Sequence, residues 1–92
     1  MKNNYLVCYD IADECRLQRV LRYMKARGLH VQYSVFYCKL GWNDLQIMKD
    51  ELKAMIAERK DDVRIYPLPA KLPVLAMGCG GRIPEGVELY LT

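Results

Sequence analysis

The amino-acid sequence predicts a two-layer α/β sandwich, in which helices pack on a sheet. Strand and helix patterns follow one another in the order β-α-β-α-β and end in a β-rich tail. The length of 92 residues allows one domain at most and a thin core, which leaves room for a partner that completes it. The hydrophobic fraction of 52% excludes a disordered tail.

The first half of the sandwich begins with a strand at 5–9 that is apolar on both faces, as a central strand would be. Asp13 is the expected N-cap of a helix that starts at Glu14, and Gly28 is its expected C-terminal stop. One buried stripe follows helical spacing: Leu17, Val20, Leu21 and Met24.

The second half begins with the extended run 30–40, which is too long for one strand, so we expect it to bend or split near Tyr33 and Ser34. A second helix is predicted over 44–60 and another strand over 63–68. In the tail, 74–77 is expected to be extended and 87–91 to form a last strand. This last strand is a candidate for pairing with the edge of a neighbouring subunit.

Charge and cysteine content narrow the class of protein. The net charge is only +3, but 15–43 contains no acidic residue and six basic ones, which suits a polyanion partner or a solvated helix face. The four cysteines form no Cys-x-x-Cys pair, so we expect reduced thiols. No apolar run approaches the ~20 residues of a membrane span and no signal peptide is evident, so a cytoplasmic protein with no membrane partner is expected.

Asp10 is the sharpest chemical feature, because it is a carboxylate directly after a buried strand. The carboxyl ends of strands are where ligand sites tend to lie, and carboxylate oxygens suit Mg²⁺. The alternative is a turn aspartate that binds nearby backbone amides. Asp13 is expected to cap the helix, although its spacing from Asp10 allows a water-mediated metal contact.

Other candidates surround this position. Arg16 and Arg19 share one face of the first helix. Arg16 lies in the first turn, where the helix dipole disfavours a positive charge, so we expect either phosphate contact or pairing with Asp10 or Asp13. Aromatic and polar side chains interleave nearby and either stack nucleobases or belong to the core. These are Tyr9, Ser34, Phe36 and Tyr37.

Taken in order, these features resemble the CRISPR-associated Cas2 proteins. The resemblance covers roughly residues 4–69. It is carried by 5–13, Arg16, Arg19, Val20, Gly28, 31–36 and 62–68.

The resemblance implies an α+β ferredoxin-like βαββαβ core over 1–69, with a C-terminal arm and strand over 70–92 that pairs with the partner subunit of a homodimer. It implies that Asp10 of each subunit faces the other across the two-fold axis and holds Mg²⁺. Family members are metal-dependent endonucleases on single-stranded RNA or double-stranded DNA. They also form the central dimer of the Cas1–Cas2 spacer-integration complex.

In that setting Mg²⁺ at Asp10 would act on a phosphodiester, and Arg16 and Arg19 would neutralise phosphates. Ser34 and Phe36 would shape the cleft, with Tyr9 beside them.

Three functions remain open from the sequence. The first is the spacer-acquisition dimer that binds duplex DNA and docks the Cas1 integrase, with or without nuclease activity of its own. The second is a stand-alone, toxin-like endoribonuclease. The third is a non-enzymatic ferredoxin-like dimerisation module.

Overall fold

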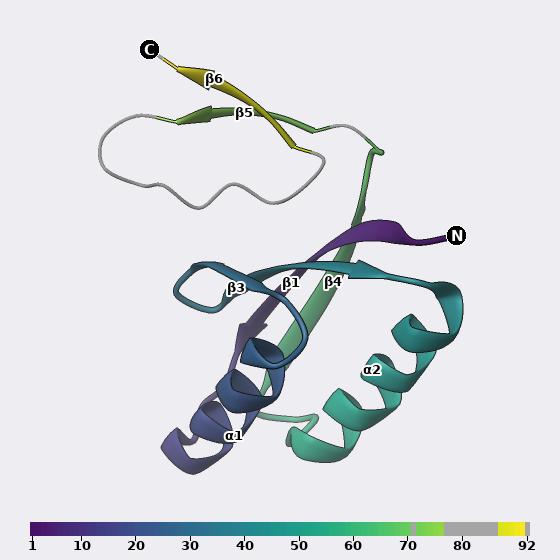
Figure 1. Ribbon diagram of the computed structural model, residues 1–92. Helices are drawn as coiled ribbons and strands as arrows, with labels where there is room; N and C mark the ends of the chain where they lie inside the picture. The colour runs from purple at the N-terminus through teal and green to yellow at the C-terminus, as the bar shows by residue number, and fades with distance from the viewer. Residues whose placement is uncertain (71, 77–86, 92) are drawn as a thin grey trace.

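The computed structural model describes residues 1–70, 72–76 and 87–91. Within this part of the chain, four strands form one antiparallel sheet in the order β2-β3-β1-β4, and both helices lie on one side of it (Figure 1). The elements of this core are β1 (Asn3–Asp10), α1 (Glu14–Lys25), β2 (Leu29–Gln32), β3 (Val35–Leu40), α2 (Trp42–Met55) and β4 (Asp62–Leu68). The predicted βαββαβ ferredoxin-like order is confirmed.

The first helix matches its sequence prediction closely. It starts at Glu14, and the Asp13 carboxylate accepts from the Arg16 backbone N–H at 2.9 Å, as an N-cap does. The helix ends at Lys25, before Gly28. The predicted split of the long extended run is also confirmed, because Tyr33 and Ser34 form the turn between β2 and β3.

The second helix differs from its predicted span of 44–60. It begins at Trp42, after Gly41 in an extended conformation, and ends at Met55, because Ile56 turns extended with a ψ of 161°. The chain then makes a short turn in which the Asp61 carboxylate accepts from the Ala57 N–H at 2.8 Å. This side-chain hydrogen bond takes the place of the next backbone hydrogen bond of the helix, so α2 ends five residues before the predicted end at residue 60.

The core lies between the helices and the sheet. Val7, Val20, Met24 and Phe36 are fully buried there, and α2 adds Met48 and Leu52. Since side chains alternate along a strand, the opposite face of the sheet carries another set of residues. We call this the open face: half-buried Leu6 and Cys8 on β1, and exposed Arg64 and Tyr66 across from them on β4.

Beyond the core, β5 (Leu72–Ala76) and β6 (Val87–Leu91) pair in parallel with each other. The last strand has its predicted bounds. The strand β5 starts two residues before the predicted extended segment 74–77, and residue 77 lies outside the described part of the chain. Pairing of the last strand with a neighbouring subunit, and the division into 1–69 and 70–92, remain predictions.

Candidate functional site around Asp10

Asp10 is the last residue of β1, and its side chain is exposed. Two neighbouring segments flank it. On one side, the Tyr9 backbone N–H donates to the Ser34 carbonyl oxygen at 3.1 Å, which places the β2–β3 turn beside the end of β1. On the other side, Asp10 lies opposite Asp62 in the antiparallel register of β4. The sequence-predicted residues Asp10 and Ser34 are therefore brought to one end of the sheet.

The Asp10 carboxylate differs from the other aspartates of this region. Among the described residues, no hydrogen bond or ion pair engages it. Asp13 caps α1, Asp61 binds Arg16, and Asp62 accepts from Arg64 Nε at 3.0 Å. The alternative interpretation of Asp10, a turn aspartate bonded to nearby amides, finds no such bond in the part of the chain that the structure describes.

Arg16 has a different partner from the ones that the sequence allowed. Its Nε donates to Asp61 Oδ2 at 2.8 Å and its Nη2 to Asp61 Oδ1 at 3.2 Å, so pairing with Asp10 or Asp13 is wrong for the guanidinium. The Arg16 side chain remains 24% exposed. One helical turn further along, Arg19 is exposed. Both arginines therefore reach solvent from the helix that begins just after the Asp10 loop.

Asp61 is the residue that sequence reasoning missed. Its side chain is 0% exposed, and it also accepts from the Ala12 N–H at 2.9 Å and the Ala57 N–H at 2.8 Å. The Arg16 guanidinium and these two amides hold the pKa of the Asp61 carboxyl well below its usual range. Because Ala12 follows Asp10 by two residues, this tether fixes the loop that carries Asp10 onto the α2–β4 connection. No local sequence signal marks a pair separated by 45 residues.

The aromatic residues that the sequence proposed as base-stacking candidates are packed inside the protein next to the site. Tyr9 stacks on Phe36 with ring centroids 6.2 Å apart, and His30 stacks on Phe36 at 4.4 Å. Phe36 is fully buried and Tyr9 is buried, and both belong to the core cluster between sheet and helices, so the core interpretation of these two rings is confirmed. Tyr37 is also buried, but it pairs with Leu6 of the open face, and its hydroxyl donates to Asn4 Oδ1 at 2.6 Å. Burial raises the pKa of the Tyr9 hydroxyl, and its hydrogen bond with Ser34 acts in the opposite direction. Ser34 is only half-buried.

The acidic groups available for a metal are few. No group of three or more histidine, cysteine, aspartate or glutamate side chains that could hold a metal ion occurs in the described residues. One chain offers the Asp10 carboxylate here, with the Asp62 carboxylate nearby already bound to Arg64. Mg²⁺ commonly binds one or two protein carboxylates and completes its shell with water and phosphate, so the donor chemistry of Asp10 fits this ion.

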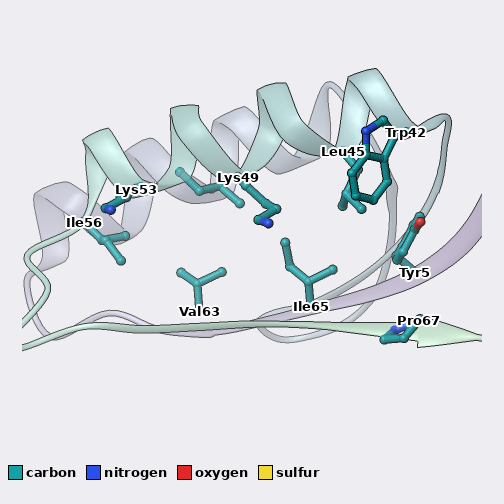
Figure 2. A pocket seen from close by; sticks show the side chains of 10 residues that line it. Tyr5, Trp42, Leu45, Lys49, Lys53, Ile56, Val63, Ile65 and Pro67 are labelled. Atoms are coloured by element: carbon teal, nitrogen blue, oxygen red, sulfur yellow. The ribbon is translucent and has the colours of Figure 1, made fainter.

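A separate groove of about 590 Å³ runs between α2 and β4 (Figure 2). Val63 and Ile65 rise from β4, Trp42 stands at one end, and the amines of Lys49 and Lys53 extend from α2. No described carboxylate, cysteine or histidine lines this groove, so it offers no metal ligands. It also contains none of the sequence-predicted site residues.

Two further expectations concern the chain as a whole. Cys8, Cys15 and Cys38 are free thiols, as predicted, and Cys79 lies outside the described residues. Neither helix in the described part of the chain is long and apolar enough to cross a membrane.

Comparison with known proteins gives a consistent result. The family model described as "CRISPR associated protein Cas2" matches residues 3–72. The chain is 57% identical over 90 residues to a protein named "CRISPR-associated endoribonuclease Cas2 2" of Thermodesulfovibrio yellowstonii, which covers 98% of this chain and 99% of that one.

Solved structures show the same likeness. A hypothetical protein, TT1823 from Thermus thermophilus, superposes with a TM-score of 0.79 at 32% identity, over 89% of this chain and 98% of that one. A chain of a solved assembly described as a partial Cas6-RT-Cas1–Cas2 complex matches with a TM-score of 0.65 at 25% identity, over 75% of each chain.

Proposed function

Because this chain belongs to the CRISPR-associated Cas2 family, we propose that it forms the homodimer at the centre of the spacer-acquisition machinery. In this proposal the dimer binds double-stranded DNA through its backbone, docks the Cas1 integrase and cleaves phosphodiester bonds of RNA or DNA in a Mg²⁺-dependent way. The similarity to a chain of a Cas1–Cas2 assembly supports the integrase partner. The observation that carries the nuclease proposal is the unengaged Asp10 carboxylate beside three aspartates of the same region, Asp13, Asp61 and Asp62, that each accept a hydrogen bond.

The sheet itself supports a second copy. The open face is not covered by the helices, and it mixes half-buried Leu6 and Cys8 with exposed Tyr66. A thin core on a short chain gains stability when a second copy covers such a face. A two-fold axis that crosses this face near the end of β1 would also bring a second Asp10 to the site, which supplies the carboxylate that one chain lacks.

The residues around Asp10 have distinct roles in the proposed reaction. Asp10 from each copy would hold Mg²⁺, which when bound polarises a phosphodiester and lowers the pKa of a coordinated water. Arg16 and Arg19 would contact phosphates, with Arg16 oriented by Asp61. Ser34 would line the cleft.

Tyr9 and Phe36 enter the proposal as buried support of the Ser34 turn, since their rings are packed in the core.

The nuclease proposal is tested with labelled single-stranded RNA and duplex DNA, with Mg²⁺ or with a chelator. Asp10→Asn keeps the shape of the side chain and is expected to reduce cleavage to the metal-free background. The matched control is Asp13→Asn, which removes the same charge three residues away and keeps the N-cap, because asparagine caps helices about as well as aspartate. Cleavage by Asp10→Asn at the wild-type rate would refute the assignment.

The acquisition role is tested separately. The protein is co-purified with its cognate Cas1, and new spacers are counted in cells that carry wild type or Asp10→Ala. We expect a complex with both forms and acquisition at least with wild type. Absence of both the complex and acquisition would refute this role even if nuclease activity is found.

A further inference from the structure

Tyr33 is an aromatic residue in an unusual position, at the tip of the β2–β3 turn. Its side chain is 85% exposed and its backbone φ is +42°, the left-handed region. A bulky residue there is uncommon, because glycine or asparagine adopts this conformation at lower cost. Backbone strain of this kind persists only where the surrounding structure enforces it, and it occurs often at functional sites.

The two residues of this turn, Tyr33 and Ser34, are fixed through hydrogen bonds to their backbone carbonyl groups. The His30 ring nitrogen Nε2 donates to the Tyr33 carbonyl oxygen, and the His30 ring is itself stacked on buried Phe36 at 4.4 Å. The next carbonyl, that of Ser34, accepts from the Tyr9 N–H at 3.1 Å. With both carbonyls fixed inward and the side chain in solvent, the ring is presented on a rigid support, which reduces the ordering cost of binding.

The turn also lies beside the candidate cleavage site. Tyr9, whose amide binds Ser34, is followed directly by Asp10. Tyr33 belongs to the stretch 15–43, which has no acidic residue, so the surrounding segment favours a polyanion. An exposed aromatic face next to a phosphate-binding region suits stacking on a nucleobase.

On the basis of the proposed function, we infer that Tyr33 stacks on an unpaired nucleobase adjacent to the phosphodiester at Asp10. A base inside a duplex has both faces covered by its neighbours, so only a single-stranded or frayed substrate offers a free face. The proposal therefore assigns to Tyr33 the selection of a strand with an unpaired base at this position. A second copy of the chain is the other candidate for covering an exposed ring, and the test below separates the two.

The test uses single-stranded oligonucleotides that carry one fluorescent 2-aminopurine, with a blunt duplex of the same sequence, in chelator so that binding is measured without cleavage. Tyr33→Ala is expected to weaken single-strand binding about five- to a hundredfold and to abolish the stacking-dependent quenching. Tyr33→Phe keeps the ring face and should bind within about twofold of wild type. Tyr33→Asn, which accepts a positive φ readily, replaces the alanine variant if circular dichroism shows that the latter is unfolded.

Trp42→Ala is the matched control. Trp42 is 69% exposed and comes two residues after Leu40, which pairs with Asn3 at the opposite end of β1 from Asp10. Removing this ring should leave single-strand binding and quenching unchanged.

Three results would overturn the inference while leaving the proposed function intact. They are wild-type binding by Tyr33→Ala, an equal loss on the duplex and the single strand, and dissociation of the dimer by Tyr33→Ala in sedimentation velocity. The last would identify Tyr33 as an interface residue. If wild type binds neither oligonucleotide, the proposed function and this inference both fail.

Discussion

Gly28 joins α1 to β2, and it lies so close to β3 that no larger residue fits. A Cβ atom at this position would stand 2.6 Å from Cys38 Sγ and 2.8 Å from the Tyr37 carbonyl oxygen, whereas ordinary contact begins at 3.4 Å. Neither neighbour yields easily. Cys38 is buried in the core, and Tyr37 is paired with Leu29 across β2 and β3.

The cost of Gly28→Ala follows from this geometry. Overpacking of a dense core costs about 1–3 kcal/mol, and the loss of unfolded-chain entropy on replacing glycine returns about 0.4–1 kcal/mol. The middle of these two ranges gives a net destabilisation of about 1–2 kcal/mol. For a domain of this size, that lowers Tm by about 5–15 °C.

Gly41→Ala is the control for Gly28→Ala, because the Cβ atom there would meet nothing closer than the Met1 carbonyl oxygen at 3.9 Å. Gly41 is the N-cap of α2, where alanine is worse than glycine by about 0.5–1 kcal/mol. The entropy gain of about 0.4–1 kcal/mol offsets this cost, so a change within about 0.5 kcal/mol is expected. Urea unfolding of both variants measures the difference. Equal stability of the two variants would show that the close approach does not constrain the fold.

Three further predictions concern two ionisable groups, Asp61 and Tyr23. Asp61→Asn should lower Tm more than Asp62→Asn does, because one amide cannot accept all the donors that Asp61 satisfies in the described structure, namely Arg16 and two backbone amides; equal melting temperatures would contradict this. Arg16 holds the pKa of Asp61 in the folded protein below its value in the unfolded chain. The stabilisation that ionised Asp61 gives the fold is therefore complete above about pH 4 and declines as the pH falls further. Urea midpoints of wild type should fall more steeply toward about pH 3 than those of Asp61→Asn. Burial, with the hydrogen bond to Glu51, raises the pKa of Tyr23 to about 12. Wild type should consequently lose stability as the pH rises from about 10 to about 12, and pH-dependent melts of Tyr23→Phe should show a shallower loss.

The parts of the fold that depend on neighbouring residues were predictable from the sequence. The start of α1 and its Asp13 cap follow from local hydrogen-bonding chemistry, and the turn at Tyr33 follows from the length of the extended run. The end of α2 was not predictable in this way, because it depends on the Asp61 side chain rather than on any break in the apolar pattern.

In the candidate site, too, the residues that could be predicted are those whose role depends only on their own segment of the chain. Asp10 could be identified from its place after a buried strand, since that argument needs only the segment itself. The Arg16–Asp61 pair joins residues 45 positions apart, and only the folded chain shows that the Asp10 loop is held through it. The burial of Phe36 likewise depends on which face of β3 meets the helices, which alternation alone does not decide.

In the proposed function, two Asp10 carboxylates, one from each copy, share one divalent ion. The most direct test is a titration with Mn²⁺ in place of Mg²⁺, followed by electron paramagnetic resonance, on wild type and Asp10→Asn with the oligomeric state measured in parallel. We expect wild type to bind one ion per dimer and Asp10→Asn to bind none. One ion per chain, or unchanged binding by Asp10→Asn, would contradict it.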